Sequence, residues 1–216
     1  MTEQHEFDKD YWERHWHQAH QDRPGAMSTS PAHPYLAREV GDLVPGSALD
    51  AGCGAGAEAI WLAVHGWQVT AVDIAPVALA RAAERAAENG VSERVRWVEA
   101  DLTAWAPETG FDLVTTHYAH PAMPQLAFYD RIAAWVAPGG TLLIVGHLHT
   151  SSAAKQGHGH GHGHHPPDEA SVTLADITAG LDSATWEITT AEEHRRTVPG
   201  REAPLHDVVV RATRRR

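Results

Sequence analysis

The chain has 216 residues, of which 43% are hydrophobic, and its formal net charge is −11 with the 17 histidines counted as neutral. That length suits one domain with a substantial core, here residues 1–216. An acidic chain argues against a nucleic-acid partner, because binding to phosphates depends mainly on Lys and Arg. The single cysteine, Cys53, excludes a disulfide bond within the chain and fits a reducing cytoplasm.

The first residues, "MTEQHEFDKD", are acidic and polar, whereas a signal peptide carries a basic segment and an apolar segment. No apolar run approaches the roughly 20 residues that a membrane-spanning helix needs. We therefore expect a cytoplasmic protein without a membrane partner, either a monomer or a homodimer.

Residues 1–40 are expected to form helical segments that cap the domain, with a loop at 23–36 that helps to close a site. Segments rich in β-branched, aromatic or apolar residues then predict strands within 47–56, 67–74, 95–102, 111–118 and 140–149. Helical segments separate these strands at 56–66, 75–90 and 124–140.

This alternation of strands and helices predicts a parallel sheet with right-handed crossovers. A further helix at 173–182 precedes two strand-like segments, 185–198 and 205–213, which the turn "PGREAP" joins as a hairpin. We predict one open α/β sheet of the Rossmann-like kind, with helices on both faces and an antiparallel edge.

The segment "LDAGCGAG" places Gly52, Gly54 and Gly56 between a strand and a helix. Glycines let the backbone approach a ligand closely, and a helix N-terminus carries partial positive charge. The loop also fits the loose dinucleotide pattern G-x-G-x-x-A, so a nicotinamide enzyme or a non-catalytic Rossmann domain stays an alternative.

Three acidic residues follow successive strands at this edge of the sheet. Asp50 precedes the glycines, where a carboxylate repels a pyrophosphate but suits an ammonium group. Asp73 ends the next strand, in place to accept hydrogen bonds from ribose hydroxyls, and Asp101 follows the third, in place for an adenine amino group. The set suits an adenosine ligand with a charged amino acid tail, which describes S-adenosylmethionine (SAM).

The segments "ALDAGCGAG", "VTAVDI", "VEADL", "FDLVTTHY" and "APGGTLLIVGH" together resemble the successive motifs of class I SAM-dependent methyltransferases. The resemblance covers roughly residues 10 to 213 and implies a seven-stranded, mostly parallel sheet with one antiparallel strand. It implies that the glycines and Asp50 hold the methionine part of SAM, that Asp73 holds the ribose and that the residues after the third strand flank the adenine. The cofactor-binding residues it implies are Asp50, Gly52, Gly54, Gly56, Asp73, Ile74, Asp101, Leu102, Thr116 and His117.

Trp12 and Trp16 lie four residues apart in "YWERHW" and would share one face of a helix. This spacing resembles the start of thiopurine methyltransferases and is similar to small bacterial tellurite-resistance and thiol methyltransferases. The resemblance implies that the aromatic pair covers the cofactor. The alternative is a helix that packs both tryptophans on the core.

The methyl acceptor is expected above the carboxyl ends of the fourth and fifth strands, which read "TTHYAHPAM" and "VGHLHT". His117, Tyr118 and His120 are the catalytic candidates there, with His147 and His149 expected on one side of the same region. A neutral histidine can serve as a base for a phenol or a thiol. A small molecule with a sulfur, oxygen or chalcogen nucleophile is the expected acceptor.

The tract "GHGHGHGHH" lies within a predicted loop insertion at 151–169 and contains imidazoles that suit zinc or nickel. Two interpretations stay open: a metal-binding loop, or a low-complexity insertion with only adventitious affinity. The rival to an enzyme is a metal-binding or metal-sensing protein on a SAM-binding scaffold. The candidate metal ligands are His147, His149, His158, His160, His162, His164 and His165.

Overall fold

The computed structural model describes residues 7–22, 30–148, 172–197 and 204–216. Within them lie the helices α1 (Lys9–Asp22), α2 (Pro34–Val40), α3 (Ala57–Val64), α4 (Pro76–Glu88), α5 (Gln125–Ala133) and α6 (Leu174–Ala179). The strands are β1 (Ser47–Ala51), β2 (Gln68–Asp73), β3 (Val95–Glu99), β4 (Phe111–His117), β5 (Val136–His147), β6 (Trp186–Arg196) and β7 (Leu205–Arg214), and a short 3-10 turn precedes β3. The predicted cap at 1–40 therefore contains α1 and α2, whereas the predicted insertion at 151–169 lies outside the described residues.

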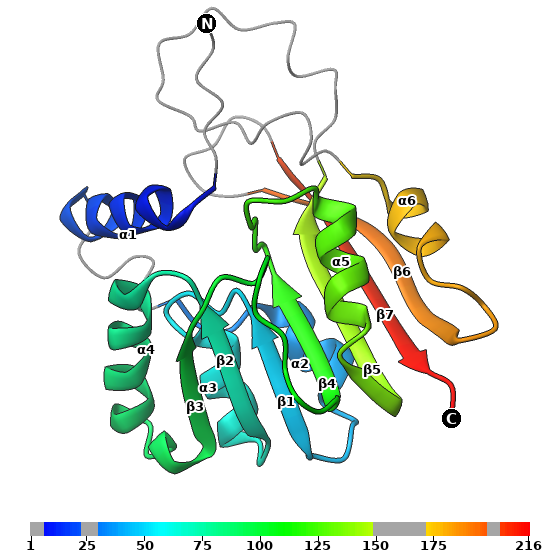
Figure 1. The fold of residues 1–216 in the computed structure, drawn as a ribbon, viewed down its shortest axis with the longest axis horizontal. Coiled ribbons are helices and arrows are strands. Elements are labelled where there is room, and N and C mark those ends of the chain that lie inside the picture. The colour runs from blue at the N-terminus through cyan, green and yellow to red at the C-terminus, as the bar shows by residue number, and fades with distance from the viewer. Residues whose placement is uncertain (1–6, 23–29, 149–171, 198–203) are drawn as a thin grey trace, which may run out of the picture.

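The strands form one seven-stranded sheet in the order β3-β2-β1-β4-β5-β7-β6 (Figure 1). Neighbours among β1 to β5 pair in parallel, whereas β7 pairs antiparallel with both β5 and β6. The predicted α/β class, the hairpin and the single antiparallel strand are confirmed. The antiparallel strand is next to the edge and not at the edge itself, because β6 takes the edge position and β7 returns between β5 and β6.

The boundary between α5 and β5 differs from the sequence prediction. The pattern predicted a helix to residue 140, but the helix ends at Ala133 and Val136 already pairs with Phe111 of β4. Pro138 offers no N–H for a helix and disfavours the helical conformation of the residue before it. The buried Val136 is therefore part of the sheet core and not of a helix stripe.

Alternate strand residues divide the core into two layers, one on each face of the sheet. Leu142 and Ile144 of β5 pack with Phe128 and Ile132 of α5, together with Ile177 of α6. The intervening residues of β5 face the other way and pack in the layer formed by α2, α3 and α4. Figure 1 shows this arrangement, with α5 and α6 in front of the sheet. The prediction of helices on both faces is confirmed.

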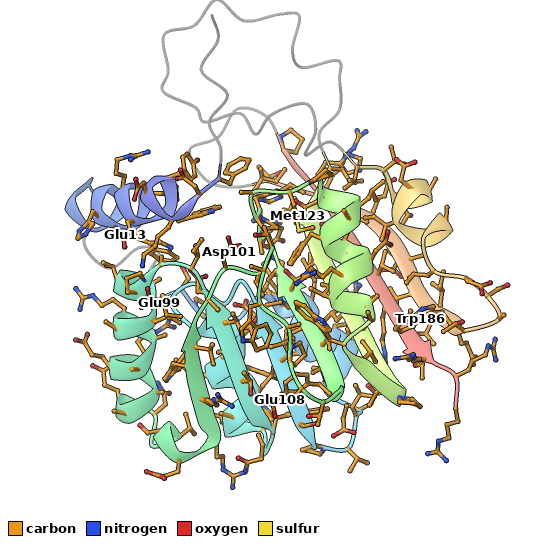
Figure 2. All side chains as sticks on the ribbon, viewed as in Figure 1. Glu13, Glu99, Asp101, Glu108, Met123 and Trp186 are labelled. Carbon is orange, nitrogen blue, oxygen red and sulfur yellow. The ribbon has the colours of Figure 1, made fainter. Side chains whose placement is uncertain are left out.

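The parallel strands bring their carboxyl ends to one edge of the sheet, and α1 lies beyond that edge, near α4 (Figure 1). Figure 2 shows Asp101 at this edge and Glu108 at the opposite one. Of the helices in the described part of the chain, none combines the length and the apolar composition required to cross a bilayer.

Candidate active site

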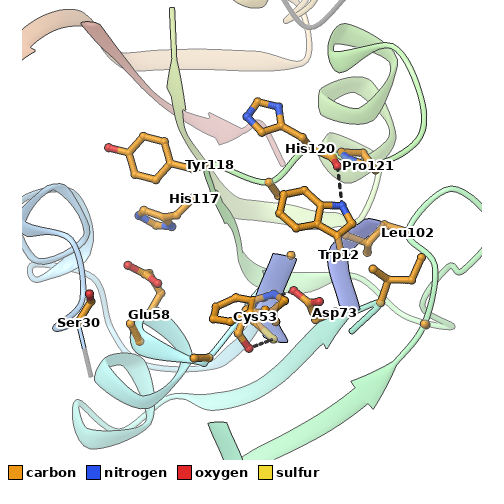
Figure 3. Close-up of a pocket in the computed structure, with 18 of the residues that line it drawn as sticks. Trp12, Ser30, Cys53, Glu58, Asp73, Leu102, His117, Tyr118, His120 and Pro121 are labelled. Carbon is orange, nitrogen blue, oxygen red and sulfur yellow. Dashed lines mark hydrogen bonds between the residues drawn. The ribbon is translucent and has the colours of Figure 1, made fainter. Parts of the chain in front are cut away.

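A cavity of about 330 Å³ lies at the carboxyl edge of the sheet, within the size range of small-molecule sites. Eleven of the residues named from the sequence line it. These are Trp12, Trp16, Gly52, Gly54, Asp73, Ile74, Asp101, Leu102, His117, Tyr118 and His120. Segments up to 108 residues apart in the sequence therefore meet at one place, as shown by the hydrogen bond from the Trp12 indole N–H to the His120 carbonyl (Figure 3).

The glycine loop owes its shape to two close approaches. Gly52 has a φ of 81°, and a Cβ built on it would lie 2.3 Å from the Cβ of Ala119. Gly54 has a φ of 50°, and a Cβ there would lie 2.8 Å from the Trp16 ring. Both positions need the left-handed backbone and the missing side chain of glycine. The loop is thus held close to α1 on one side and to the segment after β4 on the other.

Asp73 fastens this loop to the end of β2. Its carboxylate accepts hydrogen bonds from the backbone N–H of Gly54 at 2.7 Å and of Ala75 at 2.9 Å. Burial raises the pKa of Asp73, while these N–H donors lower it. Each carboxylate oxygen has two lone pairs, so the acid keeps acceptor capacity toward the cavity that it lines.

Three residues implied by the family resemblance lie behind the cavity wall and do not line it. Gly56 is the N-cap of α3 and packs against Trp97 and Ala82 of neighbouring elements. Thr116 is buried and donates from its hydroxyl to the Ala51 carbonyl at 2.8 Å. Asp50 lies beneath the glycine loop, with 1% of its surface exposed. Any contact of these residues with a cofactor stays a prediction.

Asp50 carries the most unusual electrostatics of the site. Its Oδ2 has no hydrogen-bond partner among the described residues. The backbone of Ala59 acts to lower the pKa of the carboxyl group. Burial raises the pKa of Asp50 well above its ordinary value, and the carboxylates of Glu58 and Asp73 raise it further. An unpaired buried oxygen is costly. A cationic group of a ligand would relieve that cost.

Both tryptophans of α1 face the cavity. Trp12 donates from its indole N–H to the His120 carbonyl at 3.2 Å, and Trp16 covers Gly54. The helix therefore presents one aromatic face to the glycine loop and to the segment after β4, as its four-residue spacing predicts. That this pair covers a cofactor stays a prediction.

Two histidines at the end of β4 also line the cavity: His117, the last residue of the strand, and His120, which follows it. His117 has its Nδ1 3.2 Å from the Thr115 hydroxyl, and its buried Nε2 has no partner among the described residues. Burial lowers the pKa of His117, which keeps its ring neutral at pH 7. Figure 3 shows Tyr118 beside it. His120 is fixed through Nδ1, 3.1 Å from the Gln125 side chain.

His147 does not line the cavity but lies directly behind Tyr118, with ring centroids 4.2 Å apart. Its Nδ1 is 2.9 Å from the buried carboxylate of Asp207, which also pairs with Arg196. No group of three or more potential ligands suited to a metal ion occurs in the described ranges. The other candidate ligands, His149, His158, His160, His162, His164 and His165, lie outside the described residues.

Two charged residues that line the cavity, Glu58 and Arg85, were not predicted as site residues from the sequence. Glu58 accepts a hydrogen bond from the His33 backbone N–H at 2.9 Å. Arg85 donates to the carbonyls of Ala55 at 2.7 Å and Ser30 at 2.8 Å. Arg85 thus joins α4, the glycine loop and the segment that precedes α2. Ser30 and Pro31, from the loop predicted at 23–36, line the cavity, and the role of this loop in closing the site stays a prediction.

Replacement of Arg85 by Met should loosen this junction and keep the apolar stem of the side chain. Losing the two charged hydrogen bonds should cost about 2 kcal/mol of stability. Affinity for S-adenosylhomocysteine (SAH), measured by calorimetric titration, should fall roughly tenfold as the loop becomes less ordered. Arg81→Met on the same helix is the control with the same change of charge, since the side chain of Arg81 is exposed and its ion pair with Glu84 is exposed too. Equal effects of the two changes would contradict the role of Arg85.

Fold and cavity together define a class of protein: an α/β domain with its ligand site at the carboxyl edge of the sheet and a glycine loop after the first strand. Residues 48–140 match the family model described as "Methyltransferase domain". These residues therefore match a methyltransferase domain, and the resemblance to class I SAM-dependent methyltransferases inferred from the sequence motifs is confirmed over them.

Among curated proteins, the chain is 47% identical over 110 residues to the ribosomal RNA small subunit methyltransferase C of Alcanivorax borkumensis. The aligned residues make up 48% of this chain and 33% of that protein. The chain spans less than half of the length of the first curated relatives that it matches.

The solved structures that resemble this fold include two methyltransferase-like domains. The 1,6-didemethyltoxoflavin-N1-methyltransferase of Burkholderia thailandensis has a TM-score of 0.64 at 22% identity and covers 100% of this chain and 92% of its own. TehB of Haemophilus influenzae has a TM-score of 0.66 at 15% identity, and the superposition covers 85% of this chain and 62% of the TehB chain. At these identities the similarity establishes the fold.

Proposed function

We propose that this chain transfers the methyl group of SAM to a small-molecule acceptor with a sulfur, oxygen or chalcogen nucleophile. The observation that carries the proposal is the unpartnered, buried Oδ2 of Asp50 behind a glycine loop with positive φ angles. A cationic amino acid end suits that oxygen, whereas the pyrophosphate of a dinucleotide would meet a cluster of carboxylates there.

The residues present fit the rest of the cofactor as well. We assign the methionine part to Gly52 and Gly54, the ribose to Asp73, and the adenine to Ile74, Asp101 and Leu102. Trp12 and Trp16 would shield the bound molecule from water. SAM supplies an electrophilic methyl group on a sulfonium sulfur.

On the acceptor side, the chain's own residues align a nucleophile and exclude water. His117 is neutral because burial lowers its pKa, and its buried Nε2 has no hydrogen-bond partner among the described residues. It is our candidate for taking a proton from a phenol or thiol. His120, held by Gln125, shapes the same wall.

We further propose that the protein acts in the cytoplasm, as a monomer or homodimer, without nucleic acid. Support for a small acceptor comes from the toxoflavin-type methyltransferase that shares the whole fold. Its name gives 1,6-didemethyltoxoflavin as the molecule that is methylated, at N1. The similarity to the ribosomal RNA enzyme covers only a third of that protein.

SAH release tests the proposal directly. Purified, chelator-treated chain is incubated with SAM and a panel of thiols, phenols, amines, tellurite and selenite, each with and without zinc or nickel, and SAH is measured by mass spectrometry. We expect release with a thiol, phenol or chalcogen acceptor in the absence of metal. Release that requires an added metal would favour the metal-dependent alternative, and no release despite SAM binding would contradict the proposal.

A further inference from the structure

Tyr118 separates the cavity from a polar cluster behind it. Its backbone φ is 56°, a left-handed conformation that a bulky side chain adopts only when its surroundings hold it. The ring of His147 stacks behind it, and His147 is in turn fixed by the buried Asp207. The tyrosine is therefore held in one orientation before any ligand binds.

His33 determines how the Tyr118 hydroxyl is used. The Nδ1 of His33 accepts from the Tyr35 backbone N–H at 3.4 Å, and its Nε2 lies 3.3 Å from the Tyr118 hydroxyl oxygen. Burial lowers the pKa of His33 to about 4, so the imidazole is neutral at pH 7 and carries one hydrogen. Because Nδ1 accepts, that hydrogen is on Nε2, and His33 donates to the tyrosine oxygen.

Arg196 lies against the same tyrosine, with its Cζ 5.9 Å from the ring centroid. Burial raises the pKa of Tyr118, and the guanidinium of Arg196 opposes that shift. A guanidinium has no acceptor atom, so Arg196 cannot take the hydroxyl hydrogen. Among the described residues the tyrosine oxygen is hydrogen-bonded by His33, and no acceptor is found for its own hydrogen.

We propose that Tyr118 donates its hydroxyl hydrogen to the methyl acceptor, and that His33 is the positioning residue that reserves this hydrogen. The inference rests on the proposed function and narrows the acceptor to an aryl oxygen or sulfur anion, a phenolate or an arylthiolate. The donor to the hydroxyl oxygen polarises the hydroxyl and strengthens the hydrogen bond that it gives. A cationic amine offers no lone pair to this donor.

The test uses the full chain loaded with SAH and 4-nitrophenolate as the probe, followed by its absorbance. 4-Nitrobenzylammonium, with the same ring and a positive charge, is the competitor. Tyr118→Phe removes the hydroxyl. His33→Asn keeps a preferred helix-capping side chain for α2 but is too short to reach Tyr118. Tyr35→Phe is the matched control, because it removes a neighbouring hydroxyl that belongs to the cluster behind Tyr118.

We expect the probe affinity to fall about tenfold in Tyr118→Phe and roughly threefold or more in His33→Asn, the size of one lost or misdirected hydrogen bond. SAH affinity and the Tyr35→Phe control should stay unchanged, and the preference for the phenolate over the ammonium should shrink only in the first two variants. Failure of wild type to bind the probe, equal binding by Tyr118→Phe, or tighter binding of the ammonium would overturn the inference. Failure to bind SAH itself would instead contradict the proposed function, and this inference with it.

Discussion

Asp50→Asn is expected to weaken SAH binding about a hundredfold, or about 3 kcal/mol, as loss of a buried charge-assisted hydrogen bond does. The same change should stabilise the ligand-free protein. The side chain is buried with one oxygen unpartnered, and the neutral amide removes the charge that Glu58 and Asp73 repel. Calorimetric titration measures the affinity, and denaturant unfolding measures the stability.

The pH dependence follows from the raised pKa of Asp50. Because the pKa of Asp50 is higher in the folded protein than in the unfolded chain, the protonated carboxyl group favours folding. Its contribution to stability is therefore lost as pH rises from the ordinary carboxyl range through the raised pKa. Over that same interval, affinity for an ammonium-bearing ligand should increase, because the carboxylate form is the one that pairs with it.

Asp50→Asn should remove both effects of pH. Asp42→Asn is the control with the same change of charge, at a carboxylate whose side chain is 69% exposed. A variant at Asp50 that binds SAH as tightly as wild type, with an unchanged pH profile, would show that this carboxylate does not serve the amino end of the cofactor.

Gly56→Ala is expected to cost about 4 kcal/mol of stability, the combined effect of a left-handed backbone and an overpacked contact. Gly56 has a φ of 74°, and a Cβ there would lie 2.6 Å from the Trp97 ring and 2.8 Å from the Cβ of Ala82. All three groups are in the layer between α3, α4 and the sheet, so none can move without displacing the start of α3. SAH affinity should fall too, because α3 begins directly after the glycine loop.

Gly90→Ala separates the two contributions. Gly90 has a φ of 69° with nothing within 4 Å of the added methyl group, so only backbone strain of about 1 kcal/mol applies. Denaturant unfolding of both variants measures the difference. Equal losses of stability at the two positions would mean that the packing of Gly56 against Trp97 contributes nothing.

The parts of the site that follow strand ends were predictable from the sequence. Asp73 and Asp101 are found at the cavity because parallel strands deliver their carboxyl ends to one edge, and that rule needs only the strand pattern. The order of the last two strands was not predictable in the same way. A hairpin pattern fixes that β6 and β7 pair, but not which of them inserts beside β5.

Other features depend on contacts that no local pattern encodes. Arg85 has the ordinary spacing of a charged residue on an amphipathic helix, and only the fold brings it to Ser30, 55 residues away. His33 occurs in a loop next to proline, and its partner Tyr118 is 85 residues away. The end of α5 was misplaced because Trp135 and Val136 continue an apolar pattern that suits either a helix or a strand.

We propose above all that the cavity binds SAM through the glycine loop and the acids around it. Calorimetric titration of the chelator-treated full chain with SAH, and separately with NADH, tests this binding in wild type and in Asp50→Asn. We expect one SAH site per chain in wild type, a large loss of affinity in Asp50→Asn and no binding of NADH. Binding of NADH without binding of SAH would contradict the proposal.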